Sequence, residues 1–252
     1  MKVSIITVTK NAISTIQDCF DSIQSQTYDD IEHIVIDGKS SDGTLELIKS
    51  NNRISKYISE NDENLYDAMN KGIALCTGQL IGILNSDDVF DNSHVIEDVV
   101  NSIGNNDALY SDLCYVKNNN LNKVVRYWKS GAYTNESFKK GWMAPHPTLF
   151  VRKEIYNKYG CFNINLSNSA DYELILRLFY KFKINVKYLA KTTVRMRVGG
   201  VSNKSIANRL KANKEDQLSW ELNDLDKPLL FSFFKPLRKL PQYLLKPDYN
   251  NE

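Results

Sequence analysis

The sequence contains few of the residues that cross-link small folds or bind zinc. Its four cysteines, Cys19, Cys76, Cys114 and Cys161, lie far apart and form no Cys-x-x-Cys pair, and the 252 residues include only three histidines. This spacing argues against a structural zinc site or a disulfide framework, and it favours a reducing compartment.

Long apolar runs and a strong charge of one sign are also missing. No uninterrupted apolar stretch reaches the roughly 18 residues needed to span a bilayer, and no signal-peptide pattern precedes the first apolar run, so we expect a cytoplasmic protein. The net charge is only +2 and there is no arginine-rich stripe, which argues against a nucleic-acid partner. With 42% hydrophobic and 25% charged residues, the composition is that of a soluble globular chain.

Short β-branched runs alternate with helical periodicity through the first hundred residues. This alternation predicts an α/β fold, with a mostly parallel sheet and helices on both faces. The predicted strands cover residues 3–8, 33–37, 57–58 and 80–84. The predicted helices lie at 13–23, around 45–48, at 65–76 and at 95–103, and Ser14 with Gln17 suggests a capping box for the first of them.

The second half of the chain is less regular. Strands are predicted at 108–116 and 124–128, joined by a turn at 118–120, and a further strand at 186–189. Helices are predicted at 170–182 and 204–223.

A basic and apolar tail follows residue 226. Between residues 227 and 246 it has five basic residues and no acidic one. Its leucines and phenylalanines could share one helix face: Leu230, Phe234, Leu237, Leu240 and Leu244. This pattern is typical of a segment lying in a membrane interface. The alternative is packing against the rest of the chain or a second subunit, and Pro236 and Pro241 weaken a continuous helix.

Acidic residues follow two of the predicted strands. Asp87 and Asp88 come after the run LIGIL, where a divalent cation bridging a diphosphate could compensate two adjacent carboxylates. Asp37 ends HIVID, where it could accept hydrogen bonds from a nucleobase or ribose. A plain capped turn is the alternative at both places.

Two residues of the second half are candidates for acid–base chemistry. Asp171 lies at the start of a predicted helix, where it is either a general base or a simple helix cap. His146 lies between Pro145 and Pro147 in a predicted loop, and such a histidine is more often structural.

Six segments in order resemble the bacterial glycosyltransferases called family 2, which have the GT-A fold. They are SIITVTKN, HIVIDGKSSDGT, ISENDENLYDAMNKGI, GILNSDD, HPTLFVRKEIY and ADYELILRL, spread over residues 4–178. A further run, GGVSNKS at 199–205, resembles a loop in members that build polysaccharide repeat units. The resemblance implies a metal-dependent, inverting enzyme of the hexosyltransferase class. Its donor would be a nucleotide-diphosphate sugar, with UDP as the expected nucleotide. The acceptor would be a saccharide, with polyprenyl-diphosphate-linked saccharides among the candidates.

The resemblance also implies roles for single residues. Asp171 would be the catalytic base and Asp88 the ligand of Mg²⁺ or Mn²⁺, with Ser86 standing where many members have a further aspartate. The donor would be bound by Thr7, Thr9, Asn11, Asp37, Lys71 and Asp87, although a salt bridge on its own helix is the alternative for Lys71. Candidate acceptor or diphosphate contacts are His146, Arg195 and Asn203.

The implied organisation is a catalytic domain at 1–226, followed by the tail at 227–252. Within the domain, a nucleotide-binding half would cover about 1–105 and an acceptor-binding half about 106–226. The tail would allow peripheral contact with the inner face of the cell membrane. Two other functions stay open: a sugar-phosphate nucleotidyltransferase, although no glycine- and arginine-rich phosphate loop occurs early in the chain, and an inactive nucleotide-sugar-binding protein, although Asp88 and Asp171 are both present.

Overall fold

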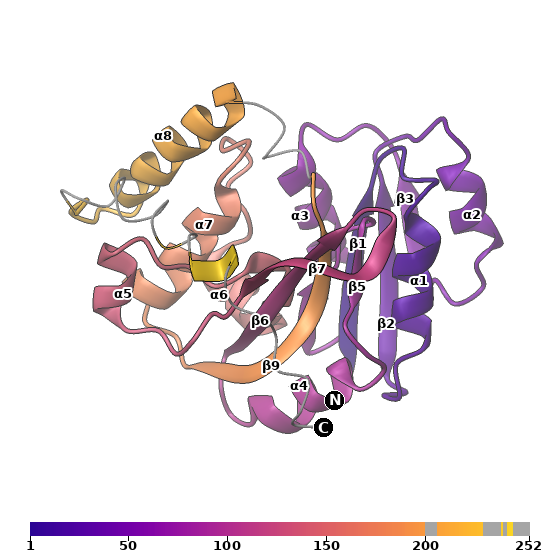
Figure 1. Cartoon of the computed structure of the whole chain (residues 1–252), viewed down its shortest axis with the longest axis horizontal. Coiled ribbons are helices and arrows are strands. Elements are labelled where there is room, and N and C mark those ends of the chain that lie inside the picture. Colours follow the sequence, from indigo (N-terminus) through magenta and orange to yellow (C-terminus); the bar gives the residue numbers. More distant parts are fainter. Residues whose placement is uncertain (200–205, 229–237, 239–240, 244–252) are drawn as a thin grey trace.

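The computed structural model describes residues 1–199, 206–228, 238 and 241–243 (Figure 1). Its centre is a nine-stranded sheet in the order β3-β2-β1-β4-β8-β6-β9-β5, and β7 pairs with β6 off this path. The strands are β1 (Val3–Thr9), β2 (Ile31–Asp37), β3 (Lys56–Ser59), β4 (Leu80–Ile83), β5 (Asp88–Phe90), β6 (Ala108–Lys117), β7 (Asn120–Trp128), β8 (Phe150–Arg152) and β9 (Val186–Arg197).

Helices cover both faces of this sheet. They are α1 (Ile16–Gln24), α2 (Thr44–Ser50), α3 (Leu65–Leu75), α4 (Val95–Ile103), α5 (Asn135–Lys139), α6 (Lys153–Tyr159), α7 (Ala170–Ile175) and α8 (Ile206–Leu222). Single turns of 3₁₀-helix lie at η1 (His146–Thr148) and η4 (Pro241–Tyr243). The predicted α/β fold is therefore confirmed.

The alternating side chains of β1 explain the two helical layers. Val3 and Ile5 pack into a core with α1 and α4, whereas Ile6 and Val8 pack into a second core with α3. Because successive residues of a strand point to opposite faces, a strand that is buried along its whole length needs cover on both sides. Strands β1, β2, β3 and β4 pair in parallel, which places their carboxyl ends at one edge.

The sheet also contains two short antiparallel strands, β5 and β8, that the sequence did not indicate. The three-residue strand β8 joins β4 to β6, and β5 pairs only with β9 in the described sheet. Strand β9 runs to Arg197, well beyond the predicted end at residue 189, because its second part pairs with both β6 and β5. The predicted helix at 170–182 is also divided: α7 continues as a π-helix, η2 (Leu176–Lys181).

The capping box predicted at Ser14 is wrong. Helix α1 begins at Ile16, after Thr15, and no side chain caps it. The preceding amides find partners in the loop after β2 instead: Ala12 donates to Thr44 Oγ1 at 2.9 Å and Ile13 donates to Asp42 Oδ2 at 3.0 Å. Tertiary hydrogen bonds thus replace the local ones.

Part of the tail lies on the sheet. Gln242 is buried against β7, where its Oε1 accepts a hydrogen bond of 2.7 Å from Arg126 Nε. The five apolar residues expected to form one helix face lie outside the described residues. Among the described residues, no helix is both long and apolar enough to cross a membrane.

Candidate functional site

The turn between β4 and β5 carries the candidate metal ligand. It runs beside the end of β1, where Ser86 N donates to the Val8 carbonyl at 3.3 Å. Asp88 has no exposed surface, and its Oδ2 receives a hydrogen bond of 3.4 Å from Asn85 Nδ2. Burial, and next the charge of Asp87, raise the pKa of the Asp88 carboxyl well above its usual value. A carboxylate in such surroundings needs a compensating cation.

Three buried oxygens in this region lack a hydrogen-bond partner within the described part of the chain: Asp88 Oδ1, Asn85 Oδ1 and Thr9 Oγ1. Carboxylate, amide and hydroxyl oxygens are the ligands that Mg²⁺ and Mn²⁺ favour. The residues present therefore fit a hard divalent cation. The described residues contain no cluster of three or more acidic, histidine or cysteine side chains that could hold a metal, so phosphate or water oxygens would have to complete the coordination.

Arg197 fixes this turn from the end of β9. Its Nη1 donates to the Asp87 carbonyl at 2.7 Å, its Nε donates to the Asn118 carbonyl at 3.2 Å, and its Nη2 forms an ion pair with Asp18 of α1. The guanidinium is nearly fully buried. One side chain thus ties the turn to a helix and to the β6–β7 hairpin.

Asp37 lies at the end of β2 with no exposed surface. Its carboxylate accepts hydrogen bonds from Ser40 N at 3.1 Å, from Ser40 Oγ at 2.5 Å and from Ser59 Oγ at 2.5 Å. These bonds shape the loop after β2 and connect it to β3. Binding of a donor by Asp37 stays a prediction, and it would add to a structural role that the contacts establish.

The β1 residues expected at the donor differ in their placement. Thr7 has no exposed surface, and its hydroxyl lies 3.0 Å from His33 Nε2 inside the fold. Thr9, two residues further on, is 7% exposed, and its buried hydroxyl has no partner among the described residues. Asn11 follows in an exposed turn with a positive φ of 52°, where its side chain accepts a hydrogen bond of 2.9 Å from Ser41 N. Thr9 is therefore the better placed of the two threonines for a ligand.

Lys71 forms ion pairs with three acidic side chains. Its Nζ lies 2.8 Å from Glu60, 2.8 Å from Asp62 and 3.2 Å from Asp67. Burial alone would lower the pKa of Lys71, but these carboxylates outweigh it and raise the pKa. The geometry favours the salt-bridging alternative for this residue.

Asp171 lies in the first turn of α7 and faces α3. Tyr66 of α3 donates its hydroxyl to Asp171 Oδ1 at 3.1 Å, and burial followed by the charge of Asp171 raises the pKa of Tyr66 well above its usual value. Phe162 stacks on Tyr66 at 5.5 Å and meets the ring of His146 edge-on at 5.4 Å. Burial lowers the pKa of His146, and the Asp171 carboxylate acts against this. Asp171 therefore borders a cluster of aromatic rings that includes His146.

Tyr115 of β6 lies beside Arg126. Burial, opposed by Arg126, raises the pKa of Tyr115, and the charges of Asp88 and Asp171 add to the rise. The Arg126 guanidinium lies 4.3 Å from the Tyr115 ring and 5.5 Å from the ring of Tyr243, so η4 adjoins the same region.

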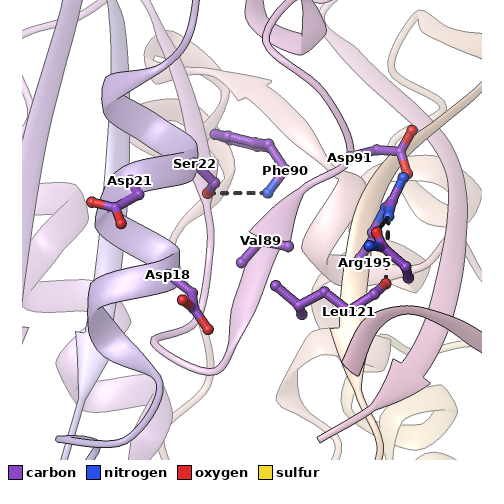
Figure 2. A pocket seen from close by; sticks show the side chains of 9 residues that line it. Asp18, Asp21, Ser22, Val89, Phe90, Asp91, Leu121 and Arg195 are labelled. Atoms are coloured by element: carbon purple, nitrogen blue, oxygen red, sulfur yellow. Dashed lines mark hydrogen bonds and ion pairs between the residues drawn. The ribbon is translucent and has the colours of Figure 1, made fainter. Parts of the chain in front are cut away.

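Arg195 lies in β9, beyond the predicted end of this strand at residue 189. Figure 2 shows it pointing toward Asp91, with which it forms an ion pair of 2.7 Å, and its Nη1 donates to Asn122 at 2.9 Å. It lines a shallow pocket together with Asp18, Val89 and Leu121. Contact with acceptor or diphosphate stays a prediction for Arg195. Asn203, and the loop 199–205 beyond its first residue, lie outside the described residues.

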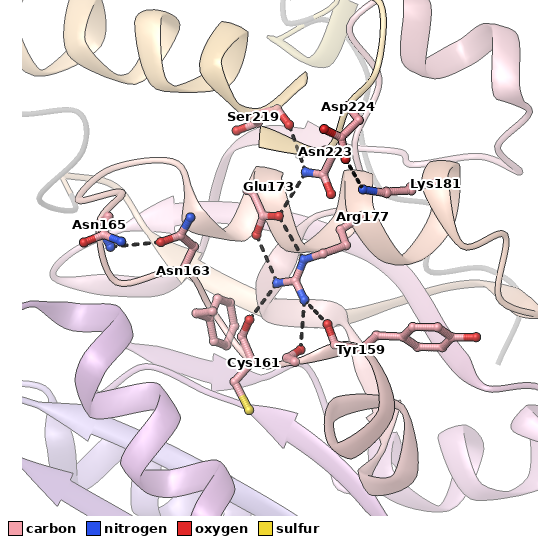
Figure 3. A network of polar contacts seen from close by, with 12 residues as sticks. Tyr159, Cys161, Asn163, Asn165, Glu173, Arg177, Lys181, Ser219, Asn223 and Asp224 are labelled. Carbon is pink, nitrogen blue, oxygen red and sulfur yellow. Dashed lines mark hydrogen bonds and ion pairs between the residues drawn. The ribbon is translucent and has the colours of Figure 1, made fainter. Parts of the chain in front are cut away.

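A network of buried polar contacts holds α7 between two other helices (Figure 3). Glu173 forms a two-point ion pair with Arg177 at 2.9 and 3.0 Å, and it accepts a hydrogen bond of 3.0 Å from Asn223. Arg177 also donates to the carbonyls of Tyr159, Gly160 and Cys161, where α6 ends. The helix that carries Asp171 is thus fixed to α6 and to the end of α8.

Sequence reasoning missed several residues that shape the site. Tyr66 lies in a matched segment, but its spacing marks it only as helical. Arg197 and Tyr115 carry no local signal, because their partners come from distant segments. The alternation in VRMR hints that a strand includes Arg197.

Comparison with known proteins decides the family. Residues 4–160, more than half of the chain, match the family described as Glycosyl transferase family 2.

The chain belongs to glycosyltransferase family 2.

A relative in sequence is also a glycosyltransferase, and a solved structure of another protein has a similar fold. A PGL/p-HBAD biosynthesis glycosyltransferase of Mycobacterium bovis is 29% identical over 207 residues, which cover 79% of this chain and 78% of that protein. Residues 1–349 of S. aureus TarS in complex with UDP-GlcNAc superpose with a TM-score of 0.69 at 17% identity, covering 90% of this chain and 68% of that one. This chain spans 41% of a longer TarS structure.

A second solved structure also has a similar fold. The mannosyltransferase PcManGT from Pyrobaculum calidifontis, in complex with GDP-Man and Mn²⁺, has a TM-score of 0.63 at 15% identity and covers 96% of this chain and 73% of that one. The GT-A fold and the glycosyltransferase family expected from the sequence are confirmed.

Proposed function

We propose that this glycosyltransferase inverts the anomeric carbon while it transfers a sugar from a UDP-sugar to an acceptor hydroxyl. The observation that carries the proposal is the pair of carboxylates: buried Asp88, beside buried oxygens that lack a partner among the described residues, and Asp171, which accepts a hydrogen bond from Tyr66. One carboxylate suits the diphosphate end of a donor and the other suits an acceptor.

Asp88 would hold Mg²⁺ or Mn²⁺, with Thr9 and Asn85 supplying nearby oxygens. Such a cation, when bound, supplies a Lewis acid that stabilises the diphosphate leaving group. Arg197 binds the backbone of this turn at Asp87 and so holds in place the turn that carries Asp88. Thr9, Asn11 and Asp37 would contact the nucleoside at the ends of β1 and β2.

Asp171 would take the proton from the acceptor hydroxyl as the oxygen attacks the anomeric carbon. The Tyr66 hydroxyl, 3.1 Å from Oδ1, orients the carboxylate and leaves Oδ2 for the acceptor. The attack comes from the face opposite the nucleotide, so a single displacement inverts the configuration. No second carboxylate is needed as a nucleophile, in contrast to a retaining glycosidase.

Assembly of a cell-surface polysaccharide on a lipid-linked acceptor would suit this chain, and the basic tail would then bring it to the inner face of the membrane. The TarS and mannosyltransferase structures support a nucleotide-sugar donor, since they are complexes with UDP-GlcNAc and GDP-Man. The PGL/p-HBAD relative supports a biosynthetic glycosyltransferase.

A donor screen tests the proposal. Thermal shift with UDP-glucose, UDP-galactose, UDP-N-acetylglucosamine, GDP-mannose and the free diphosphates, each with and without Mn²⁺, reports binding. Nucleoside diphosphate release with an oligosaccharide panel reports transfer, and NMR of the product reports the anomeric configuration. Metal-dependent transfer with inversion supports the proposal. Binding without turnover would favour an inactive nucleotide-sugar-binding protein, and release of pyrophosphate from a nucleoside triphosphate would favour a nucleotidyltransferase.

A further inference from the structure

The loop before α7 is capped by a helix that is distant in sequence. Ser169 is the residue before α7, and its side chain does not cap the helix. Instead, Glu215 of α8 accepts from Asn168 N at 2.8 Å and from Ser169 N at 3.0 Å through Oε2, and from Ser167 N at 3.4 Å and Ser167 Oγ at 3.2 Å through Oε1. Three consecutive amides thus converge on one carboxylate that is only 8% exposed.

Further contacts connect the same two helices. Ser169 Oγ donates to the Ala212 carbonyl at 3.0 Å, Trp220 Nε1 donates to the Tyr172 hydroxyl at 2.9 Å, and Asn223 donates to Glu173. Residues 169, 172 and 173 therefore face α8. Because each residue of a helix is turned by about 100° from the one before, Asp171 is directed away from α8, toward Tyr66.

We infer that Glu215 is a positioning residue for Asp171, an inference that rests on the proposed role of Asp171 as the base. A carboxylate has only acceptor sites, so both of its oxygens can bind the converging amides. Without it, buried amides lose their partners and the loop must rearrange. Asp171 lies two residues beyond this loop, and a displacement of about 1 Å at a reacting group can lower turnover by about a hundredfold.

Glu215→Gln is the test, because it keeps the shape of the side chain but turns an NH₂ group toward amide donors. Glu221→Gln, an exposed change on the same helix, is the matched control. Hydrogen exchange of a peptide covering residues 165–175 should accelerate in Glu215→Gln and stay at the wild-type rate in Glu221→Gln. With the donor and Mn²⁺ identified by the screen, kcat should fall by about ten- to a hundredfold, while the Kd for UDP stays unchanged.

A double variant separates positioning from general damage. If Glu215 acts through Asp171, Asp171→Asn combined with Glu215→Gln is no slower than Asp171→Asn alone. Wild-type kcat and wild-type exchange in Glu215→Gln, with Asp171→Asn inactive, overturn the inference and leave the proposed function standing. Full activity of Asp171→Asn instead removes the base assignment itself.

If Glu215→Gln does not fold, Glu215→Asp decides, since it keeps the charge but ends one methylene short. Faster loop exchange with a lower kcat and an unchanged Kd for UDP supports the inference. Unchanged exchange and kcat overturn it.

Discussion

Arg197 donates a hydrogen bond of 2.7 Å to the backbone carbonyl of Asp87, across 110 residues of sequence. The same guanidinium pairs with Asp18 of α1. The turn is therefore fixed through its backbone, and Asp88 Oδ1 has no hydrogen-bond partner within the described part of the chain.

Asp88→Asn should abolish metal-dependent turnover, because the amide removes the charge that holds the cation. The metal-free protein should be at least as stable as the wild type, since burying an uncompensated carboxylate costs free energy. Thermal unfolding with and without Mn²⁺ and UDP, together with turnover, checks both statements. Asp21→Asn, an exposed change on α1, is the control. An Mn²⁺-induced shift equal to that of the wild type would count against the metal assignment.

Asp171→Asn should lower kcat by about two to four orders of magnitude, the range for losing a general base. The affinity for UDP should not change, because the proposed role of this carboxylate is toward the acceptor. Tyr66→Phe should give a smaller loss, since it removes only the 3.1 Å hydrogen bond that orients the base. Steady-state kinetics and calorimetry with UDP measure both. A collapse of UDP affinity in Asp171→Asn would instead make this residue a donor ligand.

Asp37→Ala should have two effects that can be separated. It leaves the donors of Ser40 and Ser59 without an acceptor, which should lower the free energy of unfolding by about 1–3 kcal/mol. It should also weaken UDP binding by about 1.5–3 kcal/mol if Asp37 bonds the nucleoside. Ser59→Ala is the control, because it removes one structural bond and keeps the carboxylate. Equal UDP affinity in Asp37→Ala and the wild type would leave only the structural role.

His33 should make the fold sensitive to mild acid. Burial lowers the pKa of this histidine from 6.5 to about 4. Between these pH values the unfolded chain therefore binds a proton that the folded chain does not bind. The free energy of unfolding is therefore at its full value above pH 6.5 and declines as the pH falls to about 4, by about 3 kcal/mol in total. Urea unfolding at pH 7, 5.5 and 4.5 should show a smaller decline in His33→Gln than in the wild type.

His94→Gln is the control for that experiment, because its side chain is 62% exposed. It should show the same decline as the wild type. Glu32 contributes at a lower pH: burial would raise its pKa, but hydrogen bonds from Thr77 and Ser4 outweigh this and lower the pKa to about 2. Its share of the stability is therefore lost only as the pH falls from about 4.5 toward 2.

The tail should bind anionic membranes if its basic and apolar residues act as proposed. Cosedimentation with vesicles containing anionic lipid should pellet the full chain but not a chain ending at Asp226. Added salt should release part of it by screening the basic residues. A full chain with Lys235, Lys239 and Lys246 changed to Gln keeps the packing of Gln242 on Arg126 and should pellet less. If neither the full chain nor the chain ending at Asp226 pellets, the packing alternative is favoured.

The first half of the fold could be predicted from the sequence because its signals are local. Strand runs such as VSIITV and the helical spacing of α3 and α4 are readable from neighbouring residues. The second part of β9 is polar and basic, and it becomes a strand only because β5 and β6 lie on either side of it. Strand β8 is too short for its alternation to be recognised.

The candidate site divides in the same way. Asp88 and Asp171 stand in segments whose residue order resembles the family, so both could be named. Arg197 and Glu215 bind backbone groups of segments 110 and about 47 residues away. No spacing rule reveals such partners, since the backbone has the same groups at every position.

The pairing of β5 has a consequence for how the enzyme is made. Asp88 begins a strand whose partner in the sheet is β9, with Asp88 opposite Met196. A ribosome would have to add more than a hundred residues after Asp88 before that partner exists. Pairings of such long sequence separation form late, because closing the intervening loop costs entropy first. A nascent chain or fragment that stops near residue 105 should therefore fold β1, β2 and β4 without fixing the Asp88 carboxylate, so the proposed cation site would stay incomplete until β9 has been made.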